Sequence, residues 1–141
     1  MTDQNVRANV SDELAHAENA LKAAQALLDL GLAADAASRI DYAAFHAARA
    51  LLFSLGMEAK THGSTRSLLA RHFVKTGRLP PAASKELSQL EGLRMAGDYE
   101  TGFALGADDV RPELEKARRF VSDARNILRQ DGWIHDDGDA P

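Results

Sequence analysis

The stretch that decides the fold is SRIDYAAFHAARALLFSLG, at residues 38–56. It continues an alanine-rich run from about residue 33, and Gly56 is the expected stop. Alanine and leucine favour helix, and a helix that is apolar nearly all round must be covered on more than one side. We therefore expect a helix over residues 33–55 that is either central in the domain or meets a second subunit. Its apolar residues are Ile40, Tyr42, Ala43, Ala44, Phe45, Ala47, Ala48, Leu51, Leu52 and Phe53.

The composition extends this helical reading to the whole chain. The 141 residues are the usual size of one domain. There are 26 alanines and 18 leucines but only 5 valines and 3 isoleucines. Because β-branched residues favour strands, this balance argues against a large β-sheet. The chain contains no cysteine, which excludes disulfides, thiolate metal sites and cysteine nucleophiles.

Four further segments have helical patterns, at about residues 12–30, 65–75, 81–99 and 108–130. The first and last carry apolar seams spaced 3, 4, 3, 4, which is typical of bundle helices. Ser11 is the expected N-cap of the first helix. The predicted fold is all-α, an up-and-down bundle of four main helices plus a short fifth. We expect residues 1–10 to be a flexible N-terminus, 11–130 the bundle and 131–141 an acidic flexible tail. The seams are Leu14, Ala17, Leu21, Ala24 and Leu28, and Leu114, Ala117, Val121, Ala124 and Leu128.

Charge and hydropathy limit the possible binding partners and the cellular location of the protein. The formal net charge of −4 argues against a non-specific nucleic-acid coat but allows a local basic groove. Of the 17 cationic residues 12 are arginine, the better partner for phosphate. No apolar run approaches the ~18–20 residues of a membrane span, and the first ten residues lack an apolar signal core. We expect a cytoplasmic protein without a membrane segment.

The sequence lacks the usual motifs for binding a metal ion or a phosphate. No two of the five histidines have the i, i+4 spacing of a helical zinc site, and no glycine-rich phosphate loop is present. The sequence predicts no metal site and no cofactor.

Two polar combinations are more informative. In LRMAGDY, at residues 93–99, Arg94 and Asp98 can pair across one helical turn, and Tyr99 follows at the helix end. The alternative is an ordinary exposed ion pair.

On the central helix, a strip with spacing 3, 4, 3 shares one face, and we expect it to line a cleft with Arg94, Asp98 and Tyr99. Its alternative is a buried core histidine beside an outward-reaching arginine. The strip is Arg39, Tyr42, His46 and Arg49.

Several blocks, in order, resemble the HEPN family. They are residues 38–56, KTHGS at 60–64, HFVKTGRLP at 72–80 and LRMAGDY, and the resemblance covers about residues 10–130. It implies a HEPN bundle, usually a symmetric dimer and often paired with a minimal nucleotidyltransferase in a toxin–antitoxin module. Many HEPN proteins are metal-independent ribonucleases, with an arginine followed after four to six residues by a histidine at the dimer cleft.

The chain departs from that motif at one position. Arg94 fits the family arginine, but the residue after the four-residue gap is Tyr99. A tyrosine ordinarily has a pKa near 10, against ~6.5 for histidine, so it is a poor base at neutral pH. Arg39 with His46, and Arg66 with His72, also satisfy the spacing.

Three readings of function follow. The main one is a HEPN homodimer in a toxin–antitoxin or nucleotidyltransferase-linked module, with a metal-independent cleft for RNA or nucleotide. The second is a non-catalytic module that binds a nucleotide or a partner protein, favoured by the missing motif histidine. The third is a purely structural dimerisation domain. The predicted catalytic residues are Arg94, Asp98, Tyr99 and His46, and the predicted substrate-binding residues are Arg39, Tyr42, Arg49 and His62.

Overall fold

The computed structural model describes residues 2–99 and 105–135 of the chain. These residues form only helices and the turns between them, as the sequence predicts. None of the helices combines the length and the apolar character that a bilayer-spanning segment needs within this described part. The elements are α1 (Asp3–Asp29), α2 (Ala33–Ser54), α3 (His62–Leu69), a π-helical turn η1 (Ala70–Val74), α4 (Ala83–Tyr99) and α5 (Ala107–Gln130).

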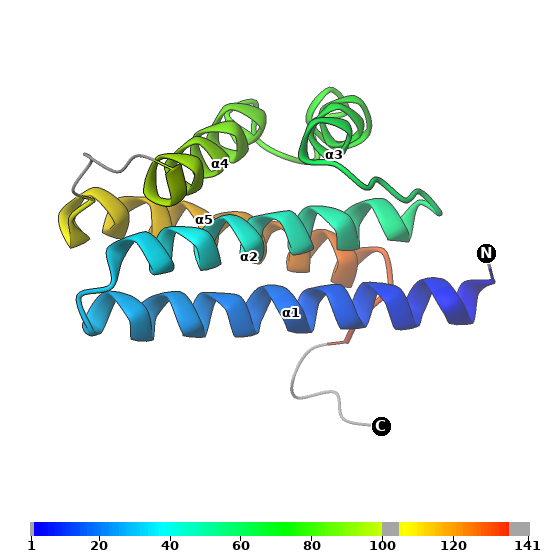
Figure 1. Ribbon diagram of the computed structural model, residues 1–141. Coiled ribbons are helices and arrows are strands. Elements are labelled where there is room, and N and C mark those ends of the chain that lie inside the picture. The colour runs from blue at the N-terminus through cyan, green and yellow to red at the C-terminus, as the bar shows by residue number, and fades with distance from the viewer. Residues whose placement is uncertain (1, 100–104, 136–141) are drawn as a thin grey trace.

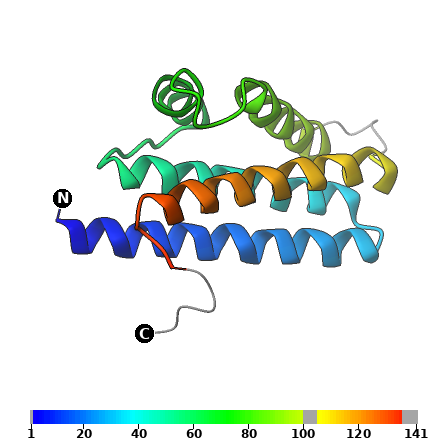
Figure 2. The ribbon, with the colours of Figure 1, turned by 180° about the vertical axis from the view of Figure 1, so that it is seen from behind.

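Helix α2 is the centre of the molecule. It contacts each of the other four helices, with α1 and α5 alongside it and α3 and α4 on its far side from α1 (Figure 1). Seen from behind, α1, α2 and α5 run lengthwise together, and α3 is viewed almost along its axis (Figure 2). Except at Tyr42, which is 40% exposed, the apolar surface of α2 is therefore largely covered within one chain. Of the two alternatives left by the sequence, the central position holds, and the apolarity of α2 no longer requires a second subunit.

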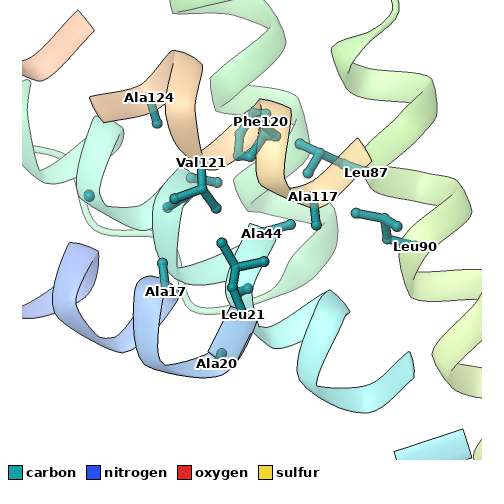
Figure 3. Close-up of a cluster of buried hydrophobic side chains, with 14 of the residues drawn as sticks. Ala17, Ala20, Leu21, Ala44, Leu87, Leu90, Ala117, Phe120, Val121 and Ala124 are labelled. Atoms are coloured by element: carbon teal, nitrogen blue, oxygen red, sulfur yellow. The ribbon is translucent and has the colours of Figure 1, made fainter. Parts of the chain in front are cut away.

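The expected seams form the core. Every seam residue of α1 and α5 is buried, and Leu87 and Leu90 bring α4 onto the same cluster. Figure 3 shows Leu21 of α1, Ala44 of α2 and Val121 of α5 meeting in this core. Small alanines on α2 let the neighbouring helices approach closely, and this close packing is what fixes the polar side chains of α2 in place.

Helix α1 starts nine residues earlier than the sequence pattern predicts. Residues 3–10, expected to be a flexible N-terminus, are helical, and Thr2 rather than Ser11 caps the helix by accepting from Asn5 N at 3.1 Å. The reason is burial, since Val6 and Val10 extend the apolar seam by two more turns.

Residues 132–134, which belong to the expected acidic flexible tail, contact the helical bundle. Arg7 donates to the carbonyl oxygens of Gly132 and Trp133 at 2.9 and 3.1 Å. The side chains of Trp133 and Ile134 pack against the core. These contacts hold residues 132–134 against α1; residues 136–141 lie outside the described part of the chain.

Candidate functional site

A buried carboxylate on α2 joins three elements. Asp41 has a side chain only 5% exposed. Its Oδ2 accepts from Arg94 Nε of α4 at 2.7 Å and from His62 Nε2 of α3 at 3.1 Å. A buried charge is costly unless it is paired, and these two bonds provide the pairing. Asp41 therefore places an arginine and a histidine side by side.

A close helix contact supports the position of Arg94. A Cβ atom built on Gly97 would lie 3.3 Å from the Cβ of Ala34, so α4 comes tightly against the start of α2 here. Glycine permits this approach because it has no side chain. The last turns of α4, with Arg94 on them, are thus drawn onto α2.

Arg94 is held between two carboxylates of different character. Its Nε bonds the buried Asp41, whereas its Nη1 donates at 3.2 Å to Asp98, whose side chain is 35% exposed. Burial by itself lowers the pKa of Arg94, but the hydrogen bonds and charges of Asp41 and Asp98 outweigh it and raise that pKa above its ordinary value. The guanidinium therefore stays charged at all relevant pH values.

The turn before α3 fixes His62. Thr61 caps the helix by accepting from Ser64 N at 3.0 Å, and Ser64 Oγ accepts from Thr61 N at 3.3 Å, which completes a capping box. The buried Thr65 donates to Thr61 O at 2.7 Å. His62 is the first residue of the helix, so its backbone position is set by these bonds.

An open groove lies over this constellation. It has a volume of about 280 Å³, and we call it the Arg94 groove. Arg39 does not line the groove, but its guanidinium lies 4.6 Å from the ring centre of the lining residue Tyr42, and no described carboxylate pairs with Arg39. Arg94 is thus a cation held in the groove, and Arg39 is a second cation next to Tyr42 that has no acidic partner in the described part of the chain. Its lining residues are Ser38, Asp41, Tyr42, Phe45, His62 and Arg94.

A second polar cluster lies on the α1 side of α2. His46 Nδ1 donates to the Glu13 carboxylate, and Arg49 Nε forms an ion pair with the same carboxylate at 3.5 Å. The His16 ring stacks at a tilt on His46, with centroids 5.3 Å apart. We call these four residues the Glu13 cluster. Arg49 also donates to the carbonyl oxygen of Ala59 at 3.3 Å, so it ties the loop before α3 to α2.

The pKa of Glu13 reflects these partners. Burial by itself raises the pKa of the carboxyl, but the His46 hydrogen bond and the charges of His46, Arg49 and His16 outweigh it. The net result is a pKa below the ordinary value of 4.5. Glu13 is therefore ionised in the folded protein and stabilises it.

Replacing Glu13 by glutamine is expected to lower the free energy of unfolding by about 1–2 kcal/mol at neutral pH. Because the pKa of Glu13 is lower in the folded than in the unfolded state, this stabilisation is fully present above pH 4.5. It is lost as the pH falls through the folded-state pKa. Urea unfolding of wild type and Glu13→Gln across this range measures it, with Glu58→Gln, at an exposed position, as control. A difference that stays constant down to strongly acidic pH would contradict the ionised role of Glu13.

The predicted site residues thus fall into two groups. Arg94, Asp98 and His62 come together around Asp41, with Tyr42 lining the same groove. His46 and Arg49 pair with Glu13 instead and do not line the groove. The sequence predicts that the whole polar strip of α2 meets Arg94 and Asp98. Residues on one helix face can nevertheless have different neighbours, and here Tyr42 faces the groove whereas His46 and Arg49 face α1. The side chain of Tyr99 lies outside the described residues.

Sequence reasoning missed two carboxylates that hold predicted site residues, Asp41 in the Arg94 groove and Glu13 outside it. The available signal for Asp41 was an acidic residue set between apolar residues in the middle of α2, which requires a partner once it is buried. For Glu13, the signal was the spacing Glu13-x-x-His16, which also occurs in helical metal sites. No group of three or more possible ligands among the described residues is arranged to hold a metal ion.

The molecule is thus a helical bundle with a polar groove built on one buried carboxylate. A family model for the HEPN domain matches residues 10–130, and the chain belongs to the HEPN family. It is 35% identical over 120 residues to UPF0332 protein glr0978 of Gloeobacter violaceus, covering 84% of this chain and 95% of that protein.

Two archaeal relatives carry a name that bears on function. "Putative toxin MJ0605" of Methanocaldococcus jannaschii is 27% identical over 130 residues, covering 92% of this chain and 96% of the relative. "Putative toxin MJ0142" of the same organism is 25% identical over 112 residues, covering 79% of this chain and 76% of the relative. These matches make the chain similar to proteins named as toxins.

Proposed function

We propose that this chain is a toxin-like, cytoplasmic HEPN protein that binds single-stranded RNA in the Arg94 groove and cleaves it without a metal ion. The observation that carries the proposal is the binding of Arg94 by Asp41. The buried carboxylate takes Nε and so fixes the guanidinium at the groove. An arginine held in this way can offer its terminal amino groups to a phosphate.

Three further features support the proposal. Arg39, without a described acidic partner, supplies a second cation beside the groove. The groove volume of about 280 Å³ lies just below the range of about 300–1,000 Å³ for sites that enclose a whole small molecule, which suits one nucleotide unit of a longer chain. Two relatives are named as toxins.

The test compares RNA and DNA strands of the same sequence in EDTA. We expect the purified chain to cleave the RNA strand only, leaving a 2′,3′-cyclic phosphate and a 5′-hydroxyl, because the 2′-hydroxyl is the nucleophile in the absence of a metal-bound water. An Arg94→Ala preparation purified in the same way controls for contaminating ribonuclease. Cleavage of both strands, or cleavage that requires a metal ion, would contradict the proposal.

A non-catalytic binding module is the second candidate. It is favoured by the pairing of Arg94 with two carboxylates, which compensates its charge before any substrate arrives. RNA or nucleotide binding that depends on Arg94, without cleavage of any RNA, would establish this alternative.

Asp98 is expected to compete with the substrate for Arg94. It occupies Nη1 at 3.2 Å and is exposed enough to move away, unlike Asp41. An exposed ion pair of this kind contributes about 0.2–1 kcal/mol, so Asp98→Asn should tighten RNA binding by up to about fivefold. Fluorescence anisotropy with a labelled 2′-O-methyl RNA measures the affinity. Weaker binding by Asp98→Asn would instead place Asp98 among the groups that hold the substrate.

Two partner proposals follow from the family. We propose a homodimer and a minimal nucleotidyltransferase as the functional partner. The dimer is supported by exposed apolar side chains, since Tyr42 lines the groove at 40% exposure and Met95, the neighbour of Arg94, is 46% exposed. Light scattering tests the first proposal, and co-purification with an adjacent nucleotidyltransferase tests the second. A monomer at micromolar concentration would contradict a groove completed by a second copy.

A further inference from the structure

The proposed cleavage requires a group that moves a proton, and the following inference rests on that proposed function. Without a metal, the 2′-hydroxyl must lose a proton as it attacks, and the departing 5′-oxygen must gain one. The motif position that would carry a histidine holds Tyr99. The proton carrier must therefore be sought among histidines elsewhere in the chain.

The five histidines occupy different surroundings. His16 and His46 belong to the Glu13 cluster, on the α1 side of α2. His72 lies in η1, and His135 lines a separate groove between α1, α5 and the C-terminal segment. Only His62 among them lines the Arg94 groove.

The ring of His62 is held on two sides. Nε2 donates to Asp41 at 3.1 Å, and the ring stacks on Phe45 with centroids 4.3 Å apart and planes 16° from parallel. The side chain is still 33% exposed, and no described residue bonds Nδ1. One ring nitrogen is thus anchored while the other is available to a substrate.

Asp41 makes His62 and Arg94 parts of one unit. Both side chains bond the same oxygen, Oδ2, so the distance between the histidine and the arginine is set by a single buried atom. A carboxylate that accepts from one ring nitrogen orients an imidazole and fixes the tautomer in which the opposite nitrogen carries no proton and can accept one. Arg94, as the second partner of that oxygen, is placed where the phosphate of the same substrate would bind.

We propose that His62 is the catalytic acid–base of this site and that Asp41 is its positioning residue. Nδ1 of His62 takes the proton of the ribose 2′-hydroxyl as the 2′-oxygen bonds to phosphorus. The bond from phosphorus to the 5′-oxygen breaks, and Nδ1 returns the proton to that oxygen. The products are a 2′,3′-cyclic phosphate and a 5′-hydroxyl, and His62 ends neutral, as it began.

The test measures single-turnover cleavage of a single-stranded RNA in EDTA. His62→Gln, which can still donate to Asp41, is expected to lower the rate by about 10²–10⁴-fold while binding of 2′-O-methyl RNA is kept. His62→Ala opens space at the ring position, and added imidazole is expected to restore part of its rate. A purely structural role of His62 would not give rescue by imidazole. His72→Gln is the matched control and should cleave at the wild-type rate.

The outcomes separate this inference from the proposed function. If the wild type cleaves, Arg94→Ala does not, and His62→Gln retains the wild-type rate, His62 is not the acid–base and only this inference fails. Loss of cleavage in His46→Gln without loss in His62→Gln would assign the role to the Glu13 cluster instead. If the wild type cleaves no RNA, the proposed function fails and overturns the catalytic role of His62 with it.

Discussion

Replacing Arg94 by lysine is expected to abolish RNA cleavage almost as completely as replacing it by alanine, by about 10³-fold or more. The reason is that different nitrogens of the guanidinium have different binding partners. Nε is bound to the buried Asp41, whereas in the proposed complex the terminal nitrogens bind the phosphate, with the exposed Asp98 displaced from Nη1. A lysine ammonium is a single point charge that cannot hold the carboxylate and the phosphate in this fixed geometry. Single-turnover cleavage and 2′-O-methyl RNA affinity measure the effect.

The control for Arg94 removes an equal charge elsewhere. Arg71→Ala, at an exposed position of η1, should leave cleavage unchanged, which separates a local effect from a change in net charge. Both Arg94 variants should lose stability but remain folded, because the lysine can still pair with Asp41 and, in Arg94→Ala, the buried carboxylate keeps its bond to His62. An unfolded Arg94→Ala protein, or an active Arg94→Lys protein, would show that this arginine is not the phosphate-binding group.

Replacing Asp41 by alanine is expected to have the largest combined effect on stability and activity. It leaves Arg94 and His62 without their shared anchor and removes a buried ion pair, for which loss of one partner costs about 3–5 kcal/mol when fully buried. Because Arg94 is 25% exposed and can turn toward water, we expect about 2–3 kcal/mol. Cleavage should fall to the level of Arg94→Ala.

Two variants separate these effects. Asp41→Asn keeps the volume and one acceptor, so the protein should stay folded while the uncharged amide positions Arg94 and His62 poorly. Asp35→Ala, an exposed acidic position near the start of the same helix, should change neither property. Urea unfolding and single-turnover cleavage give both readouts. Full activity in folded Asp41→Asn would contradict the anchoring role of the carboxylate.

The fold could be predicted well because its signals are local. Apolar residues at helical spacing define the buried faces of α1 and α5, and Gly31 and Gly56, in left-handed backbone conformations with φ of 78° and 74°, follow the ends of α1 and α2 as expected. The start of α1 is harder to predict because Ser11 resembles an N-cap, although Val6 and Val10 continue the apolar seam before it.

The site could be predicted only in part because its contacts are long-range. Helical spacing correctly paired Arg94 with Asp98, four residues apart. Spacing cannot show that Asp41, His62 and Arg94 meet, since they lie on three helices. For the same reason, His46 was grouped with Arg94 by its face of α2, although its partner Glu13 comes from α1. The three-dimensional packing around α2 decides which polar residues share a groove.

The central claim, that an RNA phosphate binds beside Arg94 and His62, can be tested most directly by nuclear magnetic resonance. The arginine Nε and histidine ring signals of the ¹⁵N-labelled protein are followed while 2′-O-methyl RNA is added, so contaminating ribonuclease cannot affect the result. We predict saturable shifts of the Arg94 and His62 signals, with the His72 and Arg71 signals unchanged. Saturable binding that leaves the Arg94 and His62 signals in place would show that the RNA binds elsewhere and would contradict the account.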